Sequence, residues 1–465
     1  MAHQTLCGEC SKQVVAEEED RLTALPEALI GMILSRIPTK EAVRTSVLAK
    51  PWRTTWTGIT AIHLTDEGLP SEDPRHSQSK RRFIEFANNV ITKCNSPLLR
   101  SFDMKCSKAY ERDSLREWTS SVLMRRELEK FHLGCRIVSG TFGIPGAIFT
   151  LQALEELKLQ LPCRLLLPAV TTFLNLKTLF LSKVRMVNDD NLPELIFHLP
   201  ALTDLGFLCC QWRNVEAIVI RAPKLLNFQM SWCRYARDGR EVFTVGLVMV
   251  NLAECCNMDK FRWAGNLVET FLMPQVSTVS QALLDQVIES NDYYHTGEAT
   301  ANLLTRLRWV DRLEISLDVA QAMLLVGRLE TLPSFQNLTS LKVESRFTSG
   351  KGTLLHLLWA TPFLKFLDLH IQESLMWRPD AFDKLEESEL PSCVIRTLER
   401  VHFTYRFQTR IWLNFMELFL RNARKLELLQ LHAPALPLAT KLDCRLRLNH
   451  APKASRKNVA IHVVL

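Results

Sequence analysis

The sequence predicts an α/β fold in which a small unit of three helices precedes a long solenoid, curved like a horseshoe, of short parallel strands. Three observations predict it. Leucine supplies 75 of the 465 residues, whereas glycine supplies only 16, well below its usual share of about 7%. Apolar residues recur at helical spacing near the N-terminus. A short leucine pattern then returns about every 20–30 residues along most of the chain.

The first twenty residues are polar and end in an acidic run, Glu17 to Asp20, which predicts a disordered segment over residues 1–20. They contain no apolar core of a secretory signal peptide. The longest nearly apolar run, residues 242–253, is shorter than the ~20 residues that span a bilayer. We therefore expect an intracellular chain, in the nucleus, the cytoplasm or both, with no membrane contact and with its 13 cysteines reduced.

Residues 25–56 carry three short amphipathic segments. Apolar residues recur every four positions from Leu25 to Ile37, which indicates a helix that Pro38 ends. Thr39 suits the start of a second helix, and Trp52 and Trp56 share one face of a third. Because about forty residues bury little surface on their own, this unit is expected to keep apolar surface for a partner.

This segment resembles an F-box in its plant version, over about residues 21–64. The resemblance rests on the Leu25-Pro26-Glu27-Ala28-Leu29 start, the Pro38-Thr39-Lys40-Glu41-Ala42 connection and the tryptophan pair. Pro51 departs from the family, which usually has arginine there. Proline fits the first turn of a helix, so we expect the fold to survive while the loss of a basic contact weakens partner binding.

The resemblance implies docking on a Skp adaptor and, through it, on a cullin. The side chains expected to contact the adaptor, or to support those contacts, are all apolar. They are Leu25, Pro26, Leu29, Ile33, Leu34, Ile37, Val43, Leu48, Trp52 and Trp56. We assign residues 21–65 to this domain.

A polar linker is predicted over residues 66–80 and a repeat region over residues 81–387. The run Leu154-Glu155-Glu156-Leu157-Lys158-Leu159 shows the L-x-x-L-x-L core of leucine-rich repeats. The middle apolar residue of successive units lies at positions 102, 131, 157, 179, 205, 228, 248, 271, 313, 341, 367, 401 and 429. The units at 248, 271 and 313 match weakly, and residues 275–306 are predicted as a helical insertion.

In each unit both leucines of the L-x-L strand turn inward, and the residue between them faces a concave parallel sheet. These outward residues include Lys158, Phe180, Gly206, Gln229, Lys342 and Asp368. Because no unit buries its own leucines, neighbouring units must stack, and the long surface that results suits another protein.

Residues 388–435 resemble the FBD module that follows the repeats in many plant F-box proteins. Residues 415–431 predict a helix followed by a strand, the shape of one more repeat, which would cap the array. Residues 436–465 are predicted as a basic tail. Six lysines and arginines against one aspartate lie between Lys441 and Leu465 and account for most of the net charge of +7.

No arrangement of residues predicts catalysis, a cofactor or a metal. Cys7 and Cys10 have the spacing of zinc ligands, but no second pair follows at a suitable distance. Phosphate-loop, nucleophile-elbow and zinc-protease motifs are missing. Cys210 and Cys233 occupy the Asn/Cys position of the repeat and are predicted to be buried. The basic tail lacks interleaved aromatic residues, so nucleic acid is not an expected partner.

The resemblance implies a non-catalytic substrate-recognition subunit of an SCF-type (Skp–cullin–F-box) ubiquitin ligase. The F-box would dock the adaptor, and the repeats would hold an unknown target protein for ubiquitination. Two alternatives remain open. One is a scaffold that binds the adaptor without ubiquitin transfer, and the other is a co-receptor in which the repeats bind a small molecule such as a hormone together with the target.

Overall fold

A computed structural model gives the structure of the chain. The residues that it describes are 25–48, 50, 52–67, 77–94, 96, 98–188, 193–237, 240–242, 248–265, 267–274, 278–285, 293–325, 327, 332–345, 351–371, 390–405, 412–434, 436–455 and 459–464. Within them, no helix combines the length and the apolar character needed to cross a bilayer.

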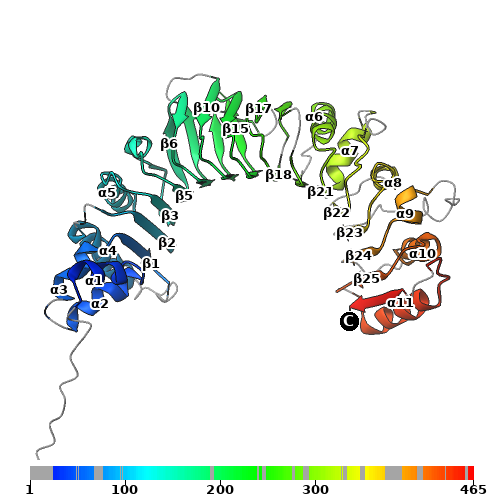
Figure 1. Ribbon diagram of the computed structural model, residues 1–465, viewed down its shortest axis with the longest axis horizontal. Helices are drawn as coiled ribbons and strands as arrows, with labels where there is room; N and C mark the ends of the chain where they lie inside the picture. Colours follow the sequence, from blue (N-terminus) through cyan, green and yellow to red (C-terminus); the bar gives the residue numbers. More distant parts are fainter. Residues whose placement is uncertain are drawn as a thin grey trace, which may run out of the picture.

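The chain forms an arch whose inner side is one parallel sheet of 15 strands (Figure 1). In sheet order, which is also chain order, these strands are β1 (Ala61–Thr65), β2 (Ser101–Tyr110), β3 (Lys130–Ile137), β5 (Glu156–Gln160), β8 (Thr178–Ser182), β11 (Asp204–Leu208), β14 (Asn227–Ser231), β18 (Lys260–Ala264), β20 (Gln281–Asp285), β21 (Arg312–Ser316), β22 (Ser340–Ser345), β23 (Phe366–Ile371), β24 (Arg400–Tyr405), β25 (Leu428–His432) and β26 (Ala460–Val464). The predicted fold class, three helices followed by a parallel-strand solenoid, is confirmed.

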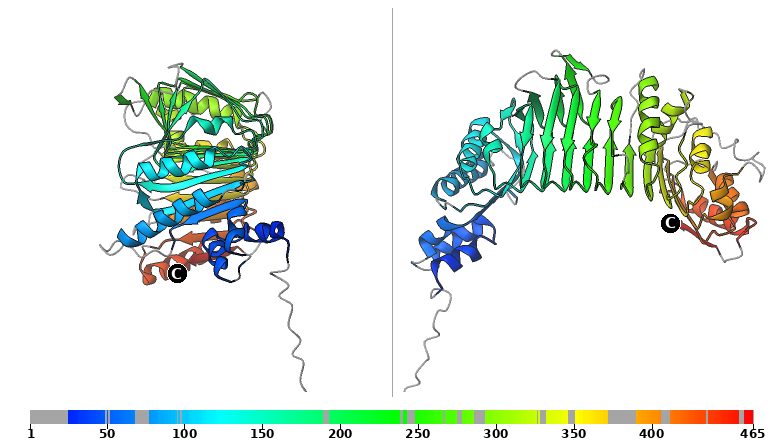
Figure 2. Two further views of the ribbon diagram at one scale, coloured as in Figure 1. Left: turned by 90° about the vertical axis from the view of Figure 1, so that its left-hand side faces the viewer. Right: turned by 45° about the horizontal axis from the view of Figure 1, so that its top comes forward.

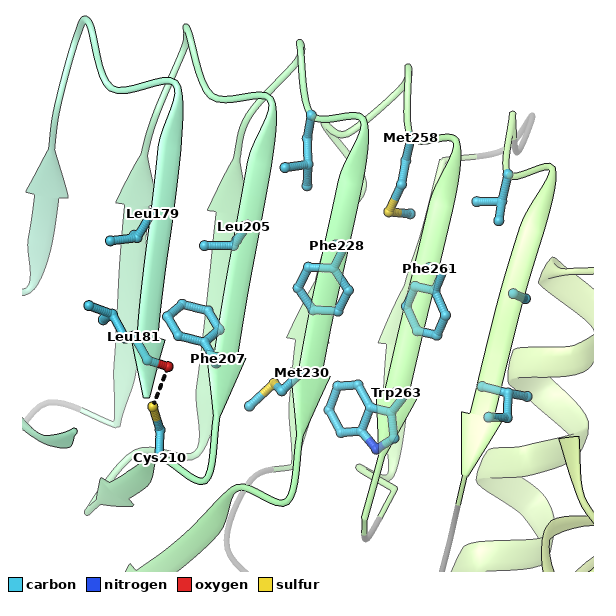
Figure 3. Close-up of a cluster of buried hydrophobic side chains, with 14 of the residues drawn as sticks. Leu179, Leu181, Leu205, Phe207, Cys210, Phe228, Met230, Met258, Phe261 and Trp263 are labelled. Carbon is cyan, nitrogen blue, oxygen red and sulfur yellow. Dashed lines mark hydrogen bonds between the residues drawn. The ribbon is translucent and has the colours of Figure 1, made fainter. Parts of the chain in front are cut away.

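Equivalent leucines of successive repeats lie side by side. Leu157 pairs in register with Leu179, and Leu179 with Leu205. Both apolar residues of each strand are buried, and the residue between them points to the opposite face because side chains alternate along a strand. Figure 3 shows Leu179, Leu205, Phe228 and Phe261 as one row of buried side chains from four adjacent strands.

The outer wall of the central repeats is also made of strands. A six-stranded sheet contains β4 (Phe142–Gly143), β6 (Cys163–Leu167), β9 (Arg185–Asn188), β12 (Gln211–Arg213), β15 (Arg234–Arg237) and β16 (Arg240–Val242). A five-stranded sheet contains β7 (Val170–Thr172), β10 (Glu194–His198), β13 (Ala217–Arg221), β17 (Met249–Asn251) and β19 (Thr270–Leu272). Figure 2 shows these repeats as a ladder of strands.

Toward both ends of the arch, helices replace the outer strands (Figure 1). On the N-terminal side these are α4 (Ser77–Lys93), α5 (Arg112–Leu123) and a short 3-10 helix, η4 (Gly146–Thr150). On the C-terminal side they are α6 (Tyr293–Arg306), α7 (Leu317–Leu325), α8 (Lys351–Trp359), α9 (Ser392–Arg396), α10 (Trp412–Asn422) and α11 (Leu438–His450).

The N-terminal unit has the three expected helices. They are α1 (Glu27–Leu34), α2 (Thr39–Arg44), which the 3-10 helix η1 (Thr45–Val47) extends, and α3 (Trp52–Thr55), which η2 (Trp56–Gly58) extends. Pro26 and Pro38 immediately precede α1 and α2, where a missing N–H costs no hydrogen bond. Pro51, the departure from the F-box pattern, lies outside the described residues.

Two of the weak repeat units are wrong. Val248 and Phe271 lie beside or within β17 and β19 of the outer wall, and the inner strands of this region are β18 and β20. The expected insertion over residues 275–306 therefore supplies an inner strand as well as helix α6. The unit at 313 is confirmed as β21.

The C-terminal region also differs from the expectation of a basic tail. Residues 438–450 form α11 and residues 460–464 form β26, which pairs with β25. The helix and strand predicted within residues 415–431 are α10 and β25, but α11 and β26 lie beyond them. The array therefore continues past the segment that was expected to cap it.

Candidate functional site

Helix α1 has two apolar faces rather than one. Ile30 and Leu34 are buried in the core, whereas Leu29 is 42%, Met32 53% and Ile33 46% exposed. Residues 29, 32 and 33 share one side of a helix because they are three and four positions apart. The helix thus uses one face to hold the unit together and leaves the other to solvent.

A second pair of exposed apolar side chains follows helix α2. Val47 is 85% exposed and Leu48 is 71% exposed. We call Leu29, Met32, Ile33, Val47 and Leu48 the exposed apolar set. Five large apolar side chains left in water within 20 residues of sequence indicate a surface that another protein covers.

The predicted adaptor-binding residues divide between this surface and the core beneath it. Pro26, Leu29, Ile33 and Leu48 are exposed and are available for contact. The remaining ones are less accessible. Leu34, Trp52 and Trp56 are buried, and Leu25, Ile37 and Val43 are half-buried. Met32 and Val47 are exposed as well but are not among the predicted residues; helical spacing from Leu29 places Met32 on the same side of the helix.

The helical unit is joined to the inner sheet without a break. The side-chain oxygen of Thr39 accepts a hydrogen bond of 2.7 Å from the backbone N–H of His63 in β1. That of Ser35 accepts one of 2.9 Å from the N–H of Thr60. Thr39 is fully buried, so its loss would leave a polar group without a partner.

Asp66 fixes the other end of β1. It is 2% exposed, and its carboxylate accepts hydrogen bonds from the backbone of Ser107 and Lys108, at 2.7 and 2.9 Å. The Tyr110 hydroxyl donates a further one, at 3.0 Å. Asp66 thereby joins β1 to the irregular stretch of β2 between Lys105 and Ala109. The sequence placed Asp66 in a polar linker, where nothing marked it as buried.

The second candidate surface is the concave face of the inner sheet. The six outward residues predicted to line it are each the third residue of an inner strand, between two buried residues. Gly206 is buried and the other five are half-buried.

Charges on this face form cross-strand clusters. Lys130 and Lys158 contact Glu156 at 2.5 and 3.1 Å. Burial would raise the pKa of the Glu156 carboxyl, but hydrogen bonds from the two lysines outweigh it and hold that pKa at about 2. In a second cluster the charges are reversed: one lysine, Lys342, contacts two carboxylates, Glu314 at 2.6 Å and Glu344 at 2.8 Å.

Burial disfavours the thiolate at most of the buried cysteines. Burial raises the pKa of Cys135 to about 12, with a smaller effect from the charge of Asp66. Cys210 is fully buried, and its thiol donates to the Leu181 carbonyl at 3.2 Å (Figure 3), which confirms the predicted buried role. Cys233 is half-buried and lies 3.7 Å from the Phe207 carbonyl. No group of three or more potential metal ligands occurs among the described residues, which exclude Cys7 and Cys10.

Comparisons with known proteins match both parts of the chain. Residues 22–59 match the family model described as "F-box domain". An F-box/FBD/LRR-repeat protein of Arabidopsis thaliana is 32% identical over 219 residues, which are 46% of this chain and 47% of that protein. A second one is 26% identical over 388 residues, with 82% of this chain and 83% of the relative covered. Against the first of these relatives, the chain therefore spans about half of the relative's length.

Among solved structures, a leucine-rich-repeat protein of Leptospira interrogans is similar over 81% of this chain and 92% of its own. The sequence identity is 14% and the TM-score is 0.32.

Proposed function

We propose that this chain is the substrate-recognition subunit of an SCF-type ubiquitin ligase. The proposal starts from the premise that the chain belongs to the plant F-box/FBD/LRR-repeat proteins. In this proposal the exposed apolar set docks on a Skp adaptor, which links the chain to a cullin. The concave face of the repeats holds a target protein. The chain itself contributes no catalytic group, because its role is to place the target near an enzyme that another subunit brings. The complex acts in the nucleus, the cytoplasm or both.

The observation that carries the proposal is the double use of helix α1. A helix that served only its own core would have no reason to expose Leu29, Met32 and Ile33 on the face opposite Ile30 and Leu34. Interface energy concentrates in a few apolar anchors of this kind, which are surrounded by contacts of little energy.

The test is the double substitution Leu29→Asp with Ile33→Asp in the full chain. Both side chains are about half exposed, so the change spares the core while placing two charges in the proposed interface. Co-purification with a plant Skp adaptor should be lost, and affinity measured by calorimetry should fall at least ~30-fold, as expected for removing even one anchor of about 2 kcal/mol.

Helix α11 offers a matched control. Leu438 and Leu442 are also four positions apart and are 60% and 45% exposed, at the other end of the arch. Leu438→Asp with Leu442→Asp should leave adaptor affinity unchanged. Unchanged affinity in the α1 variant would show the docking model to be wrong. Normal adaptor binding with unchanged target abundance after removal of the chain would instead favour the scaffold.

A further inference from the structure

Several charged residues of the concave face on either side of strands β8 to β18 have partners within the array. Glu156 is held between two lysines, and Lys342 between two glutamates. His370 lies 3.0 Å from Asp368. Charges that are satisfied internally offer little to a ligand, because breaking such a cluster offsets what the new contact contributes.

Strand β18, which lies between these clusters, differs from them. Lys260 and Arg262 lie on β18, and neither side chain has an ion pair or hydrogen bond with any residue that the structure describes. Asp204 is the carboxylate nearby, and it accepts hydrogen bonds of 2.7 Å from Asn227 and of 2.7 Å from Thr203. Two cations are therefore available here for an acidic group from outside the chain.

An aromatic ring lies on the same surface, three strands away. A Cβ atom added at Gly206 would lie 2.6 Å from Cδ2 of Phe180, closer than real Cβ atoms come. The Phe180 ring therefore lies against the backbone of Gly206, in space that any other residue would fill. A glycine inside a strand weakens it, and its presence commonly marks a close approach of this kind. Phe180 remains half-exposed on the concave side.

The ring, the two cations and two amides line one open cavity of about 320 Å³. It extends over strands β8, β11, β14 and β18 and includes Phe180, Gly206, Asn227, Gln229, Lys260 and Arg262. Strands lie about 4.8 Å apart, so β8 and β18 are separated by about 14 Å. An extended peptide advances about 3.3 Å per residue and covers that distance in about four residues.

We propose that this cavity anchors the target protein, and that it takes an extended acidic segment of the target. An aspartate or glutamate of the segment pairs with Lys260 and Arg262, and an apolar side chain about four residues away packs on Phe180. The amide of Gln229 lies between them and can bond the peptide backbone. This inference rests on the proposed function, because it gives the chemistry of the target that the repeats hold.

The experiment is selection of a phage-displayed library of random dodecapeptides on the immobilised full chain, without adaptor. The wild type should enrich peptides with an acidic residue three to five positions from an apolar one. Lys260→Glu with Arg262→Glu should shift the enrichment toward lysine and arginine. Phe180→Ala should keep the acidic preference and lose the apolar one. Arg213→Glu, at an exposed arginine of the outer strand β12, is the matched control and should select the same peptides as the wild type.

A synthetic peptide from the wild-type selection then gives the magnitudes. Its affinity should fall at least ~10-fold in the double charge-reversal variant, and the wild-type affinity should weaken as salt screens the ionic contact. Failure of the wild type to enrich acidic peptides would overturn the inference, as would an acidic preference that survives charge reversal. Adaptor binding is measured separately at helix α1, so loss of the proposed function and loss of this site give different results.

Discussion

The central repeats span residues 156–272 and the C-terminal repeats span residues 293–450. Each repeat in both regions contributes a strand to the inner sheet, but the two regions differ in their outer wall. The inner register runs through both, from Leu157–Leu179 to Leu341–Leu367 and on to Val401. Outside it, the central repeats carry two sheets, whereas the C-terminal repeats carry helices α6 to α11. The inner wall is thus a parallel sheet along the whole arch, whereas the outer wall changes from strands to helices.

The period of the apolar residues between inner strands explains the difference. In β10, Leu195 and Phe197 are buried at a spacing of two, which suits a strand. In α10, Met416, Phe419 and Leu420 are buried at spacings of three and four, which suit a helix. Helices pack about 8–10 Å apart and strands about 4.8 Å, so a helical wall lengthens the outer side of the arch and bends it more. Figure 1 shows the arch bending down toward both ends, where helices form the outside.

The largest effect is expected from Trp212→Ala in the strand-walled repeats. Trp212 is fully buried on outer strand β12, and its ring lies 5.1 Å from that of Phe207 on inner strand β11. Its removal should cost about 3–5 kcal/mol, because it leaves a cavity between the two walls. Chemical denaturation followed by circular dichroism measures it. Trp359→Ala on α8, 46% exposed, should cost less than ~1 kcal/mol. Equal losses would mean that burial between the walls is not what stabilises these repeats.

Leu420→Ala tests the helical wall in the same way. Leu420 is 1% exposed on α10, and its truncation should cost about 2–5 kcal/mol. Because repeats interact mainly with their neighbours, faster hydrogen exchange should be confined to α9, α10, α11 and the strands beneath them. Exchange that rises equally in β8 to β14 would show that the two halves unfold as one unit. The control is Leu446→Ala on α11, where the side chain is 59% exposed.

The substitution Gly206→Ala tests the packing of the Phe180 ring against the inner sheet of the central repeats. The new methyl group would displace Phe180, and we expect a loss of about 1–2 kcal/mol. Phe180→Ala in the same chain should recover most of that loss, and a double-mutant cycle of unfolding free energies measures the coupling. Strictly additive costs would mean that the ring and Gly206 are independent.

The smallest effects concern the two inverse charge clusters. The depressed pKa of Glu156 means that its stabilisation is present above its ordinary pKa of 4.5 and is lost as pH falls toward about 2. Contacts with Glu314 and Glu344 raise the pKa of Lys342 against the opposing effect of burial. Its stabilisation is therefore present below the ordinary pKa of 10.5 and is lost as pH rises through the raised value.

Each cluster is half-exposed, so we expect less than ~1 kcal/mol from either substitution at pH 7. The Tm of the Glu156→Gln variant should lie below that of the wild type at neutral pH, and the difference should shrink as the pH falls. For Lys342→Met the corresponding difference should shrink as the pH rises. Thermal unfolding across pH measures both. If the Tm of a variant stayed below that of the wild type by the same amount at every pH, its ion cluster would not contribute to stability in the expected way.

The sequence predicted the inner wall well because the L-x-L pattern is local. Units at 102, 131, 157, 179, 205 and 228 all lie on inner strands. It misplaced 248 and 271 because an apolar strand of the outer wall shows the same alternation, and only the sheet pairing tells the two apart. It missed β1 and β26, whose neighbours in sequence belong to segments that composition alone assigned to a helical unit and a tail.

For the proposed adaptor surface, periodicity indicated which residues are apolar on the helices but did not separate exposed side chains from buried ones. Leu29 and Leu34 are equally apolar in sequence, yet one is 42% and the other 1% exposed. Their different exposure depends on what packs against α1, including α3 and η2, which begin at Trp52 and Trp56. The concave cavity was beyond local patterns, because Phe180, Gly206 and Arg262 come from different repeats.

The hydrogen bonds that Ser35 and Thr39 accept from Thr60 and from His63 of β1 couple the helical unit to the arch. These bonds tie the helical unit to the start of the sheet, so in the proposed complex an adaptor bound at α1 would be held at a set angle to a target on β18. The number of repeats between α1 and β18 would then set the distance and angle between adaptor and target. In the proposed complex, removing one whole repeat would bring the target about 4.8 Å nearer along the sheet and rotate it, which would change the lysines presented to a conjugating enzyme while leaving both proposed binding sites intact.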